Sequence, residues 1–270
     1  MTKTISIIGC GWLGLPLAKS LVENNMTVKG STTSAVKLAL LKNNGINPYL
    51  IKLNPTQDDV SDFFKCDIIV INIPPRNQQE DDYFHEKQLL YLKQEAIKSG
   101  IKNIIFISST SVYPNSNSIV TEIDATYEAK SRAGISLLKM EDIFRNDTNF
   151  SSTIIRFAGL IGPERHPGRF FSNDRPNKGG TLPVNLVHLD DCINVIEKII
   201  EEDIWNETFQ VATPDHPLKK DFYSLAADKL GRPLPQFIEE PPLGFKIVNS
   251  DWLIARTGYK FKYQRLVDCL

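Results

Sequence analysis

Apolar residues recur along this chain in short runs, and helix-length segments separate the runs from one another. Continuous apolar runs of this length are typical of strands that are buried on both faces. Their alternation with helices predicts an α/β fold, a Rossmann-type doubly wound parallel sheet with helices on both faces. The predicted strands are residues 4–8, 27–30, 49–53, 68–73, 104–108, 152–157, 184–188 and 207–211. The predicted helices are residues 15–24, 34–44, 82–99, 131–144, 190–201 and 219–230.

Residues 162–180 interrupt this alternation, because glycine, proline, arginine and asparagine dominate the segment. We predict a long loop there, and loops of that length are often functional. The pattern after residue 230 predicts an irregular end. We expect residues 1–160 to form the main sheet domain and residues 161–270 to form a small C-terminal lobe that is interleaved with it and does not fold alone.

The length, charge and composition of the chain exclude several classes of protein. A length of 270 residues allows one large domain or two that share a core, at roughly 150 residues per domain. The 31 basic and 32 acidic residues give a net charge of −1, whereas a nucleic-acid partner would require an excess of positive charge. The 41% apolar content is too high for a disordered chain. No run approaches the roughly 18 apolar residues of a membrane span, and the start lacks a signal-peptide pattern. We therefore expect a cytoplasmic protein with no membrane partner.

The four cysteines are far apart and form no C-x-x-C pair. This spacing predicts neither a zinc site nor a disulfide framework. We expect reduced thiols that mostly pack in the interior, and no metal site. The cysteines are Cys10, Cys66, Cys192 and Cys269.

A G-x-G-x-x-G motif at residues 9–14 lies between the first predicted strand and the first predicted helix. In this context the first glycine permits a tight turn, the second lets the backbone approach a pyrophosphate, and the third lets helix and strand pack closely. The helix N-terminus adds free N–H groups and a partial positive charge. The motif predicts a dinucleotide site, the alternative being a glycine-rich turn without a ligand. The residues expected to contact the cofactor here are Gly9, Gly11, Trp12, Leu13 and Gly14.

Hydroxyl groups follow the second predicted strand, at Ser31, Thr32 and Thr33, with Lys37 further on and no carboxylate in reach. An acidic residue about 20 positions after the motif would favour NAD, because it accepts hydrogen bonds from the ribose hydroxyls. Hydroxyls and a lysine suit a 2′-phosphate instead. NADP is therefore the preferred cofactor and NAD the alternative, although the same hydroxyls could simply cap the next helix.

Three further segments resemble those of the extended short-chain dehydrogenases of the NAD-dependent epimerase/dehydratase family. They are residues 106–113 (FISSTSVY), 156–163 (RFAGLIGP) and 184–191 (VNLVHLDD). Within that family the chain looks most like the atypical YeeZ-like branch, on the loop at 162–170 (GPERHPGRF) and the tail at 257–263 (TGYKFKY). The resemblance covers essentially the whole chain. It implies a nicotinamide dinucleotide as cofactor and a small-molecule substrate, and it leaves a homodimer open.

The resemblance also implies roles for single residues. Ser109 stands where the family has a serine or threonine that hydrogen-bonds the substrate oxygen, although it could instead cap the end of its strand. Asn185 and His188 fall in a motif that shapes the substrate side, and a buried structural hydrogen bond accounts for His188 equally well. The residues at cofactor-contacting positions are Pro74, Pro75, Ser108, Phe157, Ala158 and Gly159.

The chain departs from the family at the catalytic pair, a tyrosine and a lysine four residues later on one face of a helix. Alignment through Ser136 and Glu141 puts Ala133 and Leu137 at these positions, and neither side chain can carry a proton. Loss of a positioned general acid costs about 10²–10⁴ in rate. Either another group transfers the proton in this chain, or the chain catalyses a different reaction or none.

Three candidates could replace the missing proton-transferring pair: Tyr127 together with Lys130, Tyr113, or an acid from the substrate loop. Lys130 could equally be a solvated surface lysine. The family's sugar-nucleotide dehydratases place an acidic pair directly after the active-site serine or threonine. This chain has Thr110 and Ser111 there, so a dehydratase is not expected.

The predicted loop carries Arg165, His166 and Arg169 among glycines and prolines. Cationic side chains on such a loop could bind a phosphate or carboxylate of the substrate. They could also be solvated, since the acidic residues Glu164 and Asp174 reduce the net positive charge of the loop. Asp190 and Asp191 are expected to cap the helix that follows them.

Three functions remain open at this point. The first is an NADP- or NAD-dependent oxidoreductase or epimerase that acts on a small polar or sugar-related substrate near Ser109. The second is a non-catalytic, dinucleotide-binding regulator or redox sensor, which the missing pair would allow. A hydroxyacid dehydrogenase or ketopantoate-reductase type has a similar N-terminus, but the segments around Ser109 and Asn185 argue against it.

Overall fold

The computed structural model describes residues 2–53, 60–74, 82–128, 132–171, 176–238 and 244–270. The chain divides into two compact units. Unit 1 consists of Met1–Ser108, Ser136–Ile155 and Ile199–Thr208, and unit 2 of Ser109–Ile135, Arg156–Lys198 and Phe209–Leu270. Each unit is built from three segments, so the chain passes between the units five times.

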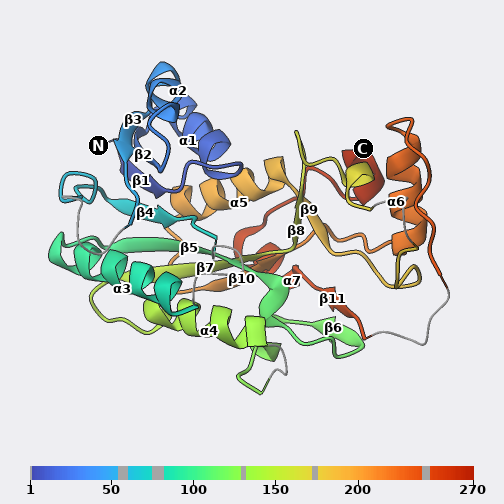
Figure 1. The fold of residues 1–270 in the computed structure, drawn as a ribbon. Coiled ribbons are helices and arrows are strands. Elements are labelled where there is room, and N and C mark those ends of the chain that lie inside the picture. Colours follow the sequence, from blue (N-terminus) through green and yellow to red (C-terminus); the bar gives the residue numbers. More distant parts are fainter. Residues whose placement is uncertain (1, 54–59, 75–81, 129–131, 172–175, 239–243) are drawn as a thin grey trace. The chain divides into compact units, whose positions relative to one another are not determined.

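The main sheet has seven strands in the order β10-β7-β5-β4-β1-β2-β3 (Figure 1). The pairs β1–β2, β1–β4, β2–β3 and β4–β5 are parallel. This is the strand order of doubly wound sheets, which bind ligands at the carboxyl ends of the strands where the order reverses. The predicted fold class is therefore confirmed, and β1 lies at the reversal. The strands are β1 (Thr4–Ile8), β2 (Thr27–Thr32), β3 (Asn47–Leu50), β4 (Ile68–Ile71), β5 (Asn103–Ser109), β7 (Ser151–Phe157) and β10 (Thr208–Val211).

Helices cover both faces of the part of the sheet that lies in unit 1. α1 (Gly14–Glu23) and α2 (Lys37–Asn43) lie on one face, and α3 (Asp82–Lys98) and α4 (Arg132–Arg145) on the other (Figure 1). α3 places Leu89, Leu92 and Ala96 on one helical face, and all three are fully buried in a core that also includes Ile69 and Phe106. Burial of each large apolar side chain stabilises the fold by about 1.5–3 kcal/mol.

Unit 2 contains two short parallel strand pairs and a second, smaller apolar core. β6 (Ser118–Val120) pairs with β11 (Lys246–Val248), and β8 (Gly159–Ile161) pairs with β9 (Leu186–His188). The core gathers Ile161, Val184, Leu186, Phe222, Tyr223 and Leu266. The helices are α5 (Leu189–Glu201), whose last turn belongs to unit 1, α6 (Lys219–Asp228) and α7 (Asp251–Thr257). The 3-10 turns are η1 (Thr110–Val112), η2 (Glu122–Asp124), η3 (Pro167–Arg169) and η4 (Leu266–Cys269).

The structure differs from the sequence prediction mainly at element ends and in short strands. β2 continues to Thr32 because this residue still pairs with Leu50 of β3. β3 ends at Leu50 rather than at residue 53, where Leu53 has a φ of 51° and leaves the extended conformation. The end predicted to be irregular contains β11 and α7, and the predicted loop contains η3. Strands as short as β6, β8 and β11 carry too few residues for a recognisable alternation.

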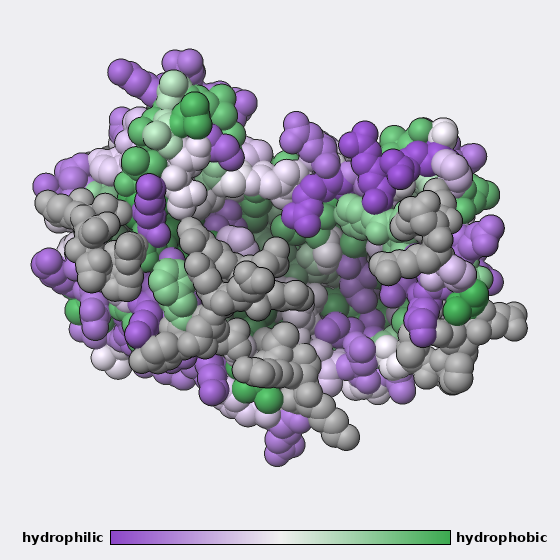
Figure 2. Space-filling view, viewed as in Figure 1, coloured by the Kyte–Doolittle hydropathy of each residue, from purple (hydrophilic) through white to green (hydrophobic). Residues whose placement is uncertain are grey.

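Hydrophilic and hydrophobic residues are interspersed on the face shown in Figure 2. Within the described ranges, no helix combines the length and the apolar character needed to cross a membrane. All four cysteines have free thiols. In the same ranges, no three histidine, cysteine or acidic side chains form a group that could hold a metal ion.

Candidate functional site

The glycine turn at residues 9–14 joins β1 to α1 and borders a pocket. Gly9 has a φ of +98°, and a Cβ there would lie 2.3 Å from the carbonyl oxygen of Asn72. A Cβ on Gly14 would lie 2.2 Å from the carbonyl oxygen of Gly9, whereas a Cβ on Gly11 would meet nothing within 4 Å. The first and third glycines are thus required by the turn itself. Gly11 borders open space, as the approach of a pyrophosphate to the backbone requires.

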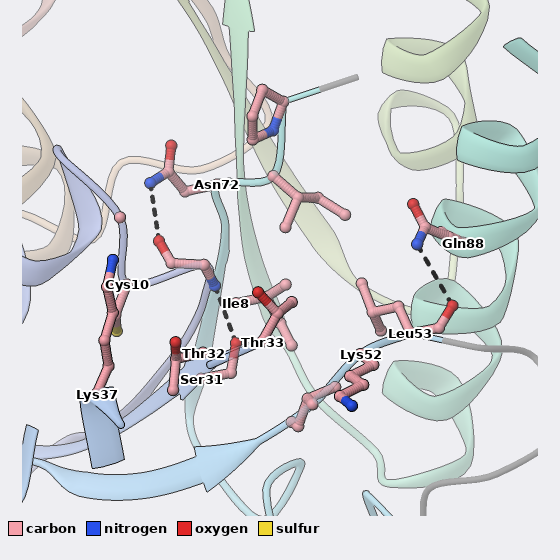
Figure 3. Close-up of a pocket in the computed structure, with 15 residues that line it drawn as sticks. Ile8, Cys10, Ser31, Thr32, Thr33, Lys37, Lys52, Leu53, Asn72 and Gln88 are labelled. Carbon is pink, nitrogen blue, oxygen red and sulfur yellow. Dashed lines mark hydrogen bonds between the residues drawn. The ribbon is translucent and has the colours of Figure 1, made fainter. Parts of the chain in front are cut away.

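Hydrogen bonds from the two neighbouring strands fix this turn (Figure 3). Asn72, which follows β4, donates from Nδ2 to the Gly9 carbonyl over 3.1 Å. Ser31 of β2 accepts from the Gly9 N–H at Oγ over 3.0 Å and from the Cys10 N–H at its carbonyl over 2.8 Å. Hydrogen bonds from both sides of β1 therefore fix the turn. A ligand that binds there would not have to order it.

The pocket has a volume of about 250 Å³ and lies within unit 1. Sites that enclose a whole drug-sized ligand measure about 300–1,000 Å³, so this pocket suits one part of a dinucleotide. Its described lining includes two lysines and no carboxylate. The lining residues are Ile8, Gly9, Cys10, Gly11, Ser31, Thr32, Thr33, Lys37, Ile51, Lys52, Leu53, Asn72, Ile73, Pro74 and Gln88.

Two lysine side chains in the lining give the pocket positive charge (Figure 3). Lys37 is the first residue of α2, and Lys52 follows β3. Thr33, an exposed residue just after β2, also lines the pocket. Cationic and hydroxyl groups in the lining of one pocket favour an anionic ligand group such as a phosphate.

The hydroxyls of Ser31 and Thr32, at the end of β2, do not cap α2. The residue at the N-cap position is Val36, which makes no side-chain cap. The hydroxyl of Thr32 instead accepts from the Ser34 N–H over 3.2 Å, and that of Ser31 accepts from the glycine turn. The interpretation of these residues as helix caps is therefore wrong, because their side chains shape the turn and the strand end.

Other predicted cofactor residues lie in varied surroundings. Pro74 lines the pocket, and Pro75 lies outside the described residues. Trp12 and Leu13 are not part of the pocket lining, and Leu13 is buried in the core. The Ser108 hydroxyl donates over 2.5 Å to Glu141 of α4, a fully buried carboxylate.

Unit 2 holds the residues predicted to act on the substrate. Ser109 Oγ accepts from the Ser111 N–H over 3.1 Å, so Ser109 caps η1. Tyr113 is buried, and its hydroxyl accepts from Arg156 Nη1 over 2.8 Å. Tyr127 is 50% exposed, and Lys130 lies outside the described residues. Ser109 and Tyr113 thus already take part in local hydrogen bonds.

The family model described as "NAD dependent epimerase/dehydratase family" matches residues 5–212 of the chain. The chain belongs to the NAD-dependent epimerase/dehydratase family. Protein YeeZ of Escherichia coli strain K12 is 34% identical over 266 residues, which cover 97% of this chain and 96% of YeeZ. The resemblance stated from the sequence is confirmed.

Solved structures share the fold of this epimerase/dehydratase family member at low identity. UDP-N-acetylglucosamine 4-epimerase from Bacillus cereus superposes with a TM-score of 0.80 at 15% identity, over 99% of this chain and 96% of that one. MoeE5 in complex with UDP-glucose and NAD superposes with a TM-score of 0.78 at 16% identity, over 96% and 94% of the two chains. A putative NAD-dependent epimerase/dehydratase from Methylobacillus flagellatus gives 0.77 at 22% identity, over 100% and 96%.

The spacing of the family's catalytic pair occurs once in this epimerase/dehydratase chain, at Tyr83 and Lys87. These residues belong to α3, which precedes Ser109, whereas the family's pair follows the serine. The position that the alignment assigns to the family's tyrosine, Ala133, lies at the start of α4. The identity of the general acid therefore stays a prediction.

The described part of the predicted substrate loop, residues 162–171 and 176–180, belongs to unit 2. Arg165 closes its first turn, and His166 Nδ1 accepts from the Gly168 N–H over 3.1 Å. A Cβ on Gly168 would lie 2.2 Å from a carbonyl oxygen of α6, so η3 packs directly on that helix. Burial lowers the pKa of His166, and the charges of Arg169 and Lys229 lower it further.

Two other predicted substrate residues make backbone hydrogen bonds within unit 2. Asn185 donates from Nδ2 to the Lys246 carbonyl over 2.9 Å and accepts at Oδ1 from the Val248 N–H over 2.8 Å, which holds β11. His188 Nδ1 accepts from the Asp190 N–H over 3.2 Å. Burial lowers the pKa of His188, against the opposing effect of Asp190 and Asp191.

The acidic pair at the start of α5 does not act as a simple helix cap. Asp191 is fully buried and accepts from the Tyr259 hydroxyl over 2.6 Å and from the Lys262 N–H over 2.7 Å. Asp190 accepts from Lys262 Nζ over 2.5 Å and from the Tyr263 hydroxyl over 3.1 Å. The prediction of a cap is corrected accordingly, since both side chains anchor the C-terminal segment.

Sequence reasoning also missed eight of the residues that line the pocket, among them Asn72, Lys52 and Gln88. Asn72 and Lys52 lie inside segments predicted as strands, but in the structure they come just after the ends of β4 and β3, and the carboxyl ends of parallel strands meet at one edge. This rule could have identified both. Gln88 comes from the middle of α3, and no sequence pattern marks it as a pocket residue.

The remaining predicted cofactor residues lie around β7 and β8 in unit 2. Phe157 and Ala158 are buried, and the Ala158 N–H donates to the Val211 carbonyl over 2.9 Å. A Cβ on Gly159 would lie 2.6 Å from a side-chain carbon of Leu186. Gly159 thus permits close pairing of β8 with β9.

Proposed function

We propose that the chain binds NADP through the unit 1 pocket and is an oxidoreductase or epimerase that acts on a small polar or sugar-related substrate. One observation carries this proposal. The pocket joins a glycine turn that is open at Gly11 to a wall with Lys37 and Lys52 and no described carboxylate. A phosphate at each of these two places matches the pyrophosphate and the 2′-phosphate of NADP.

Each part of the pocket would hold one part of the cofactor. The turn around Gly11 and the N-terminus of α1 would bind the pyrophosphate. Thr33, Lys37 and Lys52 would bind the ribose that carries the 2′-phosphate. When bound, the nicotinamide accepts or supplies a hydride. The solved structure of MoeE5 holds UDP-glucose and NAD, which supports a dinucleotide cofactor and a sugar-related substrate here.

Ser109 would hydrogen-bond the reacting oxygen of the substrate, because it is the last residue of β5, at the carboxyl end of that strand. Transfer of a hydride to or from a carbonyl or alcohol carbon needs a proton to move at that oxygen. Tyr127 with Lys130, or Tyr113, would supply this proton. Arg165, His166 and Arg169 would bind an anionic group of the substrate. A homodimer, the 1–160 and 161–270 division and a cytoplasmic location stay predictions.

A second function is a dinucleotide-binding regulator without turnover. The observation that favours it is the pair of apolar residues, Ala133 and Leu137, at the positions aligned with the family's proton-transferring pair. The two functions differ in one measurement. Oxidation of NADPH by any member of a broad carbonyl panel supports the enzyme, whereas tight cofactor binding without turnover supports the regulator.

Calorimetric titration with NAD, NADH, NADP and NADPH tests the cofactor proposal directly. We expect the phosphorylated pair to bind more tightly, and failure of all four to bind would overturn the proposal. Lys37→Ala should weaken NADPH about tenfold or more, because a hydrogen bond to a charged group contributes about 1.5–3 kcal/mol. The same change should leave NADH nearly unaffected. Lys42→Ala, an exposed change on the same helix that does not line the pocket, is the matched control.

A further inference from the structure

The end of the pocket away from the glycine turn has its own polar group. Ile51 and Leu53, which follow β3, supply buried apolar surface there, and Gln88 reaches the pocket from α3. In Figure 3 the amide of Gln88 points toward the carbonyl group of Leu53. Apolar surface beside a polar amide is the kind of environment that a heteroaromatic base occupies.

Two hydrogen bonds fix the direction of this amide. Gln88 Nε2 donates to the Leu53 carbonyl over 3.3 Å, and Gln88 Oε1 lies 3.3 Å from His85 Nδ1. Because Oε1 can only accept, this second contact places a proton on Nδ1 of His85. Both side chains are 5% exposed, so solvent does not compete strongly for them.

The amide keeps hydrogen-bonding capacity after these contacts. A carboxamide has two N–H donors and an oxygen with two lone pairs. One donor and one lone pair are used by the two contacts above, and one of each remains. The positive φ of Leu53, 51°, turns its carbonyl out of the strand conformation. Such backbone geometry in a residue other than glycine is uncommon and is often found at ligand sites.

The remaining donor and acceptor match adenine. Its amino group donates and an adjacent ring nitrogen accepts, and a glutamine amide pairs with both at once. We propose that Gln88 recognises the adenine base of the cofactor, and that His85 is a positioning residue that fixes the direction of the Gln88 amide. The inference rests on the proposed dinucleotide function, whose phosphates and ribose occupy the other parts of the pocket.

The hypoxanthine analogue of NADPH separates base recognition from binding of the rest of the cofactor. Hypoxanthine has an oxygen in place of the amino group, and its ring nitrogen N1 carries a proton, so donor and acceptor are exchanged on the edge of the base that includes N1. A freely rotating amide could turn over and fit either base, whereas an amide held by His85 and Leu53 fits adenine alone. The full-length protein should therefore bind NADPH about tenfold or more tightly than the analogue.

Variants of the protein test which residues produce the preference for NADPH over its hypoxanthine analogue. Gln88→Met keeps a side chain of similar volume and should bring the ratio of the two dissociation constants close to one. His85→Phe should lower the ratio while NADPH still binds, because the amide can then turn. Lys37→Ala should weaken both dinucleotides equally and leave the ratio unchanged. Gln94→Leu, an exposed change on the same helix, should change neither.

The outcomes are distinguishable. Binding of neither dinucleotide to the unmodified protein overturns both this inference and the proposed function. Binding of both with equal affinity, or a Gln88→Met variant that melts normally and keeps the full preference, overturns the adenine assignment alone. If Gln88→Met does not fold, Gln88→Glu provides the test, since a carboxylate accepts but cannot donate and should also lose the preference.

Discussion

Gly11→Ala should remove cofactor binding while leaving the fold intact. The added Cβ enters space that is open in the structure, and Gly11 is not among the glycines with positive φ, so alanine fits its backbone. The methyl group would, however, occupy the position through which a pyrophosphate approaches. Loss of two charge-assisted hydrogen bonds at about 1.5 kcal/mol each corresponds to about a 100-fold weaker dissociation constant for NADPH.

Gly14→Ala is the matched comparison, because it should lower the stability of the fold, whereas Gly11→Ala should weaken cofactor binding. Its Cβ would lie 2.2 Å from the Gly9 carbonyl oxygen, which is backbone and cannot move aside as a flexible side chain can. We expect a loss of about 3 kcal/mol or more in the free energy of unfolding, at the upper end for an overpacked site. Urea unfolding of both variants, with calorimetric titration of NADPH, checks the pair. A Gly11→Ala protein that binds NADPH normally would contradict the placement of the pyrophosphate.

Asp191→Ala should be among the most destabilising substitutions in unit 2. The carboxylate is fully buried and accepts from the Tyr259 hydroxyl and the Lys262 N–H. Without it these two donors lose their acceptor, and each buried donor left unsatisfied costs about 1–3 kcal/mol. The expected loss is therefore about 2–5 kcal/mol in the free energy of unfolding, measured by urea denaturation.

Tyr259→Phe is the control for this prediction. It removes one donor and keeps the carboxylate with its contact to Lys262, so the expected loss is about 1 kcal/mol. Faster amide hydrogen exchange over residues 259–263 in the Asp191→Ala protein would place the damage in the C-terminal segment. An Asp191→Ala protein as stable as the Tyr259→Phe protein would show that the carboxylate does not anchor that segment.

The parts of the structure that local chemistry determines could be predicted from the sequence. Residues 68–71 are apolar without interruption, and the strand they form is buried on both faces. The glycine motif predicted a turn in which Gly9 and Gly14 leave no room for a side chain, and the structure has that turn. Both depend on residues that are adjacent in the chain or nearly so.

Residues whose role depends on distant neighbours could not be assigned in this way. The amide of Asn185 binds the backbone of β11 more than sixty residues away, and the sequence around it gives no sign of that contact. Gln88 reaches Leu53 across 35 positions of the chain. Periodicity shows which face of a helix is buried, but the identity of the group it meets is decided by the tertiary fold.

The interleaving of the two units has a consequence for biosynthesis. Lys3, just before β1, donates from Nζ to the carbonyl of Ile200, which lies 197 residues later in the chain. The Ile154 N–H likewise donates to the Glu207 carbonyl. At a synthesis rate of about 5–20 residues per second, the start of the chain is present for roughly 10–40 s before unit 1 can be completed. During that time the sheet lacks its last strands, β7 and β10, and an incomplete sheet with an unpaired edge is vulnerable to aggregation.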